Sequence, residues 1–290
     1  MRRINGYDIA MYIIIALFSV CCLLPMLLVA MVSITDEASI VKYGYQLIPE
    51  SLSVSAYAAM FRNGSALLRS YGISIAVTLA GTLAGMTITG MAGYALANRE
   101  LLGRGVLSFY FFFTMLFSGG LVPWYIICQK LGLLNNIYAL IVPNLLFSCF
   151  NMFLVRNFMA QLPAALRESA KIDGAGEFRI AFRIYFPLST PVLATIALFI
   201  SIAYWNDWWN AIMLVDDSWL YPLQYYLFKL QSDLAMLEQL QNMGISSVVK
   251  PPTESVKMAT VVVTVGPIIL LYPYLQRYFV KGLVIGSVKG

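Results

Sequence analysis

Six long stretches without a charged residue constrain this chain more than any other feature. They cover residues 9–35, 70–98, 105–129, 131–155, 184–206 and 258–276. Each can hold a helix that crosses a hydrocarbon core of about 30 Å, which takes about 20 residues. Of the 290 residues, 60% are hydrophobic and only 11% are charged, whereas soluble domains carry roughly 25% charged residues. The sequence therefore predicts an all-α membrane protein.

The distribution of lysine and arginine predicts how the chain crosses the membrane, because cytoplasmic loops carry an excess of both. With both termini in the cytoplasm, twelve Lys and Arg residues lie inside and seven outside. External loops then cover 34–69 and 207–257, and a cytoplasmic loop covers 158–186. We expect one domain over 1–290 in the bacterial cytoplasmic (inner) membrane, with six transmembrane helices near residues 9–33, 70–98, 105–130, 134–157, 186–206 and 258–278.

The residue types present exclude several classes of chemistry. The sequence has no histidine, which removes Ser-His triads and the usual metal sites. It also has no GxxxxGK[ST] motif, so we expect no ATP site of the P-loop type. We therefore predict no catalytic residue, no metal and no cofactor on this chain. The membrane orientation and anionic lipid headgroups account for the net charge of +5, which gives no indication of nucleic acid.

Small residues and helix breakers mark two of the expected transmembrane helices. Gly81 and Gly85 form a GxxxG step, which lets helices approach closely either within the chain or between subunits. In the third expected helix, Pro123 and the run 118–120 (Ser-Gly-Gly) should loosen or break the helix. Irregular backbone at membrane depth is tolerated where it is buried in protein or lines a cavity.

The cytoplasmic loop contains a polar segment around Gly174 that predicts two short helices joined by a turn. Pro163 suits the first turn of a helix, and residues 164–172 are mostly good helix formers. Gly174 supplies a turn, and a second helix is expected from Glu177. The residues alone leave two interpretations open, a solvated connecting loop or a surface that binds a partner.

This segment resembles the cytoplasmic-loop signature of permease subunits in binding-protein-dependent ABC importers. Glu168, Ala170, Asp173, Gly174 and Ala175 match its core, and Pro187, Leu188 and Pro191 match its trailing half, while Ser169 replaces a more usual alanine. Other stretches resemble the carbohydrate-uptake, maltose-type members, namely Trp205-Asn206-Asp207 and the C-terminal tail. The stretch 207–257 and the segment 42–45 are similar to a subgroup that handles larger oligosaccharides.

The resemblance implies an oligosaccharide importer in which this chain forms half of the pathway. Segment 164–176 would be the coupling helix, and its ATPase contacts would be Glu168, Ser169, Ala170, Asp173, Gly174 and Ala175. The tail would also contact the ATPase, through Gly286, Ser287, Val288, Lys289 and Gly290. The implied partners are a second homologous permease, two copies of an ATPase that binds ATP and Mg, an extracytoplasmic solute-binding protein, the oligosaccharide and membrane lipid.

Substrate contacts and competing functions are less tightly specified. An aromatic group near the outer end of the fifth expected helix either stacks on sugar, docks the binding protein or forms an interfacial belt; it includes Tyr204, Trp205, Trp208 and Trp209, beside Asp207. Asn144 and Asn151 are further candidates for the pathway. The alternatives are an importer of amino acids, polyamines or phosphate, a secondary transporter, and a membrane scaffold. Ion-coupled transporters usually carry ionisable residues within their spans, and the six stretches carry none.

Overall fold

The computed structural model describes residues 6–62, 64–143, 145–243, 253–267 and 269. Every secondary-structure element in these residues is a helix. The chain divides into two compact units. One contains Met1–Leu67 with Leu227–Ile269, and the other contains Leu68–Tyr226 with Leu270–Gly290. The candidate site lies entirely within the second unit.

The first unit contains α1 (Gly6–Ser33), α2 (Glu37–Tyr43), α3 (Ser55–Phe61) and helical backbone at 253–267. The Glu37 carboxylate accepts hydrogen bonds from the backbone N–H groups of Glu254 (2.9 Å) and Ser255 (3.0 Å), and from the Ser255 hydroxyl (2.7 Å). A carboxylate is favourable at a helix N-terminus, where backbone donors lack helical partners. Tyr45 also donates to Glu254, at 2.6 Å. α2 and the residues just after it are thus fastened to the start of the last described helix.

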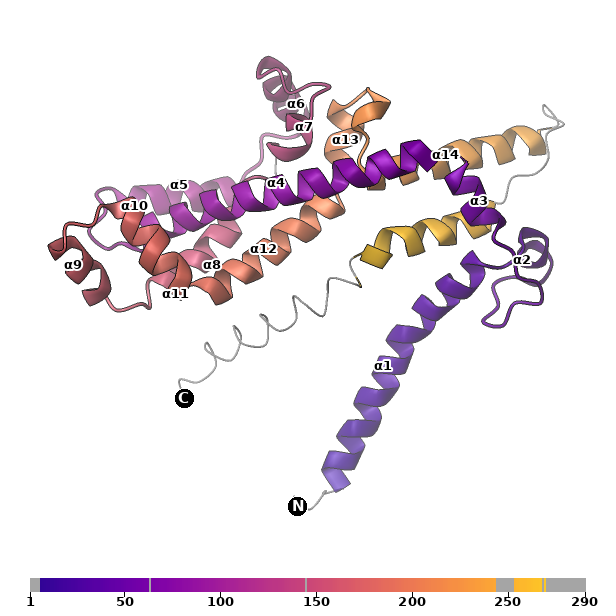
Figure 1. The fold of residues 1–290 in the computed structure, drawn as a ribbon, viewed down its shortest axis with the longest axis horizontal. Coiled ribbons are helices and arrows are strands. Elements are labelled where there is room, and N and C mark those ends of the chain that lie inside the picture. The colour runs from indigo at the N-terminus through magenta and orange to yellow at the C-terminus, as the bar shows by residue number, and fades with distance from the viewer. Residues whose placement is uncertain (1–5, 63, 144, 244–252, 268, 270–290) are drawn as a thin grey trace. The chain divides into compact units, whose positions relative to one another are not determined.

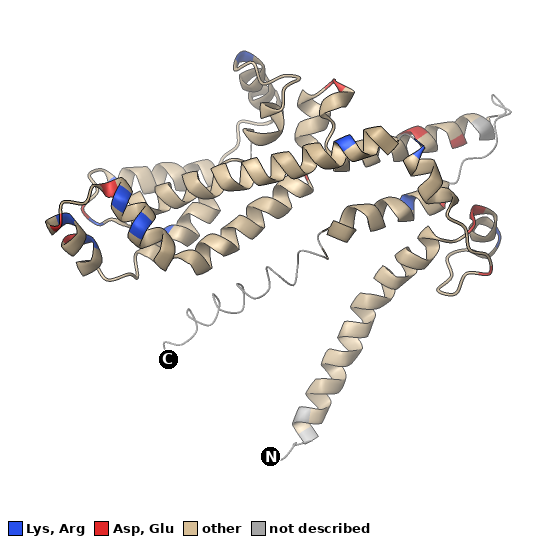
Figure 2. Ribbon diagram, in the orientation of Figure 1, with Lys and Arg blue, Asp and Glu red and all other residues tan. Residues whose placement is uncertain are grey.

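The second unit is built around long apolar helices. In Figure 1, α4 (Gly64–Ala97), α5 (Arg104–Leu116), α8 (Cys149–Met159) and α12 (Thr190–Trp205) run along one another. A smaller group follows, α6 (Leu121–Lys130), α7 (Tyr138–Ile141), α13 (Trp209–Leu214) and η2 (Ser218–Leu220). α14 (Leu223–Asn242) begins in this unit. Charged residues are sparse along α4 and α12 and collect near the ends of these helices (Figure 2).

Two helices, Ile9–Ser33 within α1 and Gly64–Ala97, are long and apolar enough to cross a membrane, and up to four spans result if two bent pairs each count as one. One pair is α5 with α6, and the chain bends by 115° between them. This break falls between Leu116 and Leu121 and confirms the prediction from residues 118–120. The expected span 134–157 contains α7 and α8, separated by non-helical backbone, and the expected span 258–278 lies partly outside the described residues. Six spans and cytoplasmic termini stay predictions.

The small residues of α4 receive side chains of the same chain. A Cβ atom on Gly81 would overlap the Tyr204 ring of α12, and one on Gly93 would lie 2.7 Å from Val155 of α8. The Tyr204 hydroxyl is fixed in turn, because it donates to the Ile141 carbonyl at 2.7 Å. Of the two interpretations of the GxxxG step, the structure supports the contact within the chain.

Candidate functional site

The cytoplasmic segment folds as the sequence predicts, with helix α9 (Ala165–Ile172) ending in a tight glycine turn. Gly174 has φ +75°, a left-handed conformation that side chains disfavour. Its N–H donates to the Lys171 carbonyl (3.0 Å), and the N–H of Ala175 donates to the Ala170 carbonyl (2.9 Å). These two hydrogen bonds form the Schellman motif. An apolar contact frequently accompanies the motif, between the positions that Ala170 and Ala175 occupy here. The signature residues at 170, 174 and 175 therefore specify how the helix stops.

The two faces of α9 differ sharply. Ala170 is buried in an apolar cluster that includes Tyr94, Ile180 and Tyr185. Glu168, Ser169, Asp173 and Gly174 are exposed. Two large apolar side chains are also exposed, Ile172 at 87% and Phe178 at 73%. The loop thus carries exposed charged and apolar side chains on a backbone that is anchored from the inside.

The return path from α9 to α12 is irregular. It consists of α10 (Glu177–Ile180), a π-helical turn η1 (Ala181–Tyr185) and α11 (Phe186–Leu188). The chain then bends by 87° between the segment Glu177–Leu188 and α12. Single π-helical turns are rare and are frequently found at functional sites. The second helix starts at Glu177, as predicted.

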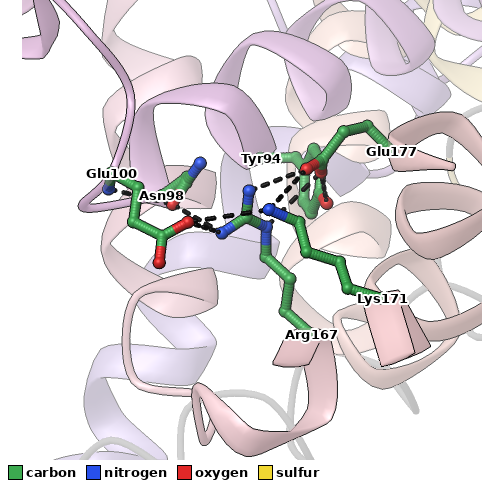
Figure 3. A network of polar contacts seen from close by, with 6 residues as sticks. All are labelled: Tyr94, Asn98, Glu100, Arg167, Lys171 and Glu177. Carbon is green, nitrogen blue, oxygen red and sulfur yellow. Dashed lines mark hydrogen bonds and ion pairs between the residues drawn. The ribbon is translucent and has the colours of Figure 1, made fainter. Parts of the chain in front are cut away.

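Arg167 is the centre of a polar network that joins α9 to two other segments (Figure 3). Its Nη1 donates to Asn98 Oδ1 (3.0 Å) and Glu100 Oε2 (2.8 Å), just after α4. Its Nη2 and Nε donate to the two carboxylate oxygens of Glu177, at 2.7 and 3.4 Å. The Tyr94 hydroxyl of α4 donates to Glu177 at 2.5 Å. The Arg167 side chain is only 12% exposed, so the network is partly shielded from water.

Lys171 adds a second positive charge to this network, 3.4 Å from Glu177 and 3.6 Å from Glu100. The hydrogen bond from Arg167 lowers the pKa of Glu177 to about 2. Arg167, followed by Lys171, also lowers the pKa of Glu100, and the bond to Glu177 raises the pKa of Arg167. Glu177, Glu100 and Arg167 are therefore charged at neutral pH.

A cavity of about 370 Å³ lies beside the network. Its walls combine the C-terminal ends of α4 and α8 with the start of α9, and include Asn98, Arg99, Met159, Arg167 and Glu168. Glu168, a predicted ATPase contact, lies at this cavity and is exposed. The loop therefore has both a projecting outer surface and a hollow beside it.

The outer candidate residues divide into packing residues and exposed ones. Tyr204 and Trp205 are buried, at 3% and 8% exposure. Asp207 accepts hydrogen bonds from the N–H groups of Trp209 (3.1 Å) and Asn210 (3.2 Å), the first two residues of α13, and burial raises the pKa of Asp207.

Trp208 and Trp209 are about two-fifths exposed and pack edge to face, with ring centroids 5.8 Å apart. Asn151 is buried in α8. Asn144 and the tail residues Gly286 to Gly290 lie outside the described residues. Among the outer aromatic candidates, all of which the structure describes, Trp208 and Trp209 therefore carry the exposed surface.

Sequence reasoning missed the Arg167 network. The available local signal was Arg167 and Lys171 four residues apart on a short helix, with Glu177 soon after. Asn98 and Glu100 could not be paired with them from spacing, because they lie 69 and 67 residues away from Arg167.

Known proteins are similar to this chain over most of its length. The family model for the "binding-protein-dependent transport system inner membrane component" matches residues 79–285. The polygalacturonan/rhamnogalacturonan transport system permease protein YtcP of Bacillus subtilis is 38% identical over 98% of both chains. The trehalose transport system permease protein SugB of Mycobacterium tuberculosis is 31% identical, over 92% of this chain and 93% of its own length.

A solved structure is similar over nearly the whole chain. It is a crystal structure of a bacterial ABC transporter involved in the import of the acidic polysaccharide alginate. One of its chains matches with a TM-score of 0.81 and 30% identity, and the match covers 96% of this chain and 98% of the other. The chain described here belongs to the family of inner membrane components of binding-protein-dependent transport systems.

Proposed function

We propose that this chain is the permease subunit of an ATP-driven importer and forms half of the pathway for an oligosaccharide. The observation that carries the proposal is α9 with its glycine turn, anchored through Ala170 and exposing Glu168, Ile172 and Asp173. In a transmembrane chain, such a surface has a function when a separate protein binds to it and moves it. The chain itself carries out no covalent chemistry, and ATP and Mg bind to the partner ATPase.

The proposed substrate is an oligosaccharide released from a larger polysaccharide. The support is the naming of relatives for polygalacturonan, rhamnogalacturonan and alginate. Polygalacturonan and alginate are acidic, so short acidic oligomers are the first to test. Trp208 and Trp209 offer exposed aromatic surface for docking the binding protein or for sugar contact.

The proposed assembly contains this chain, a second homologous permease, two copies of an ATPase and an extracytoplasmic solute-binding protein. Six transmembrane helices with both termini in the cytoplasm would place α9 on the ATPase side. Closure of the ATPases on ATP would move α9, and rigid-body rotation of the helices would open the pathway first outward and then inward. Glu168 would accept a charge-assisted hydrogen bond from a basic residue of the ATPase.

The test is to tag this chain in its native host, solubilise the membrane gently and identify stoichiometric partners by mass spectrometry. We expect a second permease and an ATPase. The co-purified binding protein is then screened against acidic and neutral oligosaccharides, amino acids, polyamines and phosphate. Recovery of the chain alone in several mild detergents would contradict the importer, and a binding protein that takes only a non-sugar solute would contradict the substrate.

A further inference from the structure

Coupling requires that a push on α9 reaches the helices that form the pathway. We propose that Arg167 is a positioning residue that locks α9 to the C-terminal end of α4, so that these two helices move as one body. This inference rests on the proposed coupling function and adds a defined route for the motion inside this chain.

Arg167 has the geometry of such a lock because one side chain holds three segments. It bonds to Asn98 and Glu100 after α4, and to Glu177 at the start of α10. Glu177 in turn accepts from Tyr94, which lies within α4 itself. α9, α10 and the end of α4 are therefore fastened to one guanidinium group.

The bonds fix orientation as well as distance. A guanidinium group is planar and presents its donors in a rigid fork, so bonds from both sides of the fork prevent rotation of the partners. The side chain is 12% exposed, which reduces competition from water. The apolar cluster around Ala170 also joins α9 to α4, but apolar contacts are non-directional and supply no bond of this kind.

The lock gives α9 a route that avoids the irregular return path. Along the backbone, motion of α9 must pass through the π-helical turn and the 87° bend before it reaches α12. Through Arg167 it reaches Asn98 and Glu100, which lie just after the C-terminal end of α4. α4 then meets α12 at Gly81 and Tyr204, and meets α8 at Gly93 and Val155. Close contacts of this kind carry a displacement without slack.

The experiment measures distances between spin labels in the transporter purified with its partner subunits. One label pair reports on α9 and α4, at Ala165 and Leu83, both exposed. A second pair reports on α4 and α12, at Leu83 and Ile202, which are also exposed. In the wild type we expect a narrow distribution of α9–α4 label distances that AMP-PNP and Mg do not change. In Arg167→Gln this distribution should broaden and should change when AMP-PNP is added. The distribution of α4–α12 distances should stay narrow.

The same samples give a functional readout. Stimulation of ATP hydrolysis by the loaded binding protein should fall about fivefold or more in Arg167→Gln, a typical size for coupling between sites. Arg167→Lys keeps the positive charge but lacks the forked donors of the guanidinium group. Its stimulation of ATP hydrolysis should lie between the values for the wild type and Arg167→Gln. Glu177→Gln added to Arg167→Gln should cause little further change, because residues of one network are not additive. Arg183→Gln, an exposed arginine of the same loop, is the matched control and should behave as the wild type.

Each outcome bears on one statement. An unchanged α9–α4 distance in Arg167→Gln overturns the lock, and so does equal broadening of both label pairs, which would show general loosening. If the wild-type chain purifies without an ATPase, the proposed function fails. The distance comparison can still be made on the chain alone, without nucleotide, and judges the contact separately.

Discussion

At the scale of single residues, Gly174 has a conformational role that can be separated from a docking role. Its φ of +75° is disfavoured for residues with a side chain, and no atom lies within 4 Å of the position that a Cβ would take. A substitution is therefore strained but not crowded within this chain. A loss of transport in Gly174→Asp would therefore have to arise from the partner or from the strained turn.

Asparagine and alanine distinguish these causes. Alanine in the left-handed region costs about 1–2 kcal/mol, whereas asparagine visits it more readily. If the turn alone matters, Gly174→Asn should transport better than Gly174→Ala. If the ATPase packs against the turn, Gly174→Asn and Gly174→Asp should insert normally and fail to transport. Uptake in cells, with membrane levels from a tagged chain, checks this, and normal uptake by Gly174→Asp would refute the docking role.

The ion pairs of Glu177 predict a pH dependence of stability. Because its pKa is lowered from 4.5 to about 2 in the folded chain, its stabilisation is present above the unfolded value and disappears as the pH falls from 4.5 towards about 2. Thermal melting of the purified chain in detergent should therefore drop more steeply over this window in the wild type than in Glu177→Gln. Glu168→Gln is the control and should keep the wild-type slope. Identical slopes in the wild type and Glu177→Gln would show that the pair is not formed in solution.

At the scale of elements, α4 and α12 meet where a glycine leaves room for an aromatic ring. A Cβ on Gly81 would overlap the Tyr204 ring, so Gly81→Ala must displace the ring and its hydrogen bond to Ile141. Overpacking of this kind costs about 1–3 kcal/mol. Gly72→Ala lies on the same helix with no atom within 4 Å, and should leave stability unchanged or slightly raised. Thermal unfolding in detergent compares the two, and equal melting temperatures would contradict the packing at Gly81.

The helix boundaries near the site follow from local chemistry. Proline, good helix formers and a glycine at a left-handed position place α9 within one residue of the predicted range 164–172. The expected span 134–157 is not one continuous helix, because a non-helical stretch separates α7 from α8, and an apolar composition alone does not show such a break.

At the scale of the whole molecule, the arrangement in the membrane can be tested by cysteine accessibility. In a background without the four native cysteines, Ser51 of the predicted external loop and Arg179 of the predicted cytoplasmic loop are changed to cysteine; both are exposed. A membrane-impermeant maleimide should label Ser51→Cys in intact cells and Arg179→Cys only after permeabilisation. Labelling of both in intact cells, or the reverse pattern, would contradict the predicted orientation.

The sequence by itself determined the membrane class, the short helices of the cytoplasmic loop and the family, because each depends on residues that are close along the chain. The length of a hydrophobic stretch, the bias of charge between loops and a glycine turn are local properties. The family signature is likewise a run of residues that are close in the sequence. The tertiary structure alone decided which face of α9 is anchored, that Arg167 holds α9 to the end of α4, that Tyr204 fills the space at Gly81, and that Glu37 caps a helix more than 200 residues away. These pairings depend on how separate helices meet, and the pattern within one helix does not specify its partner.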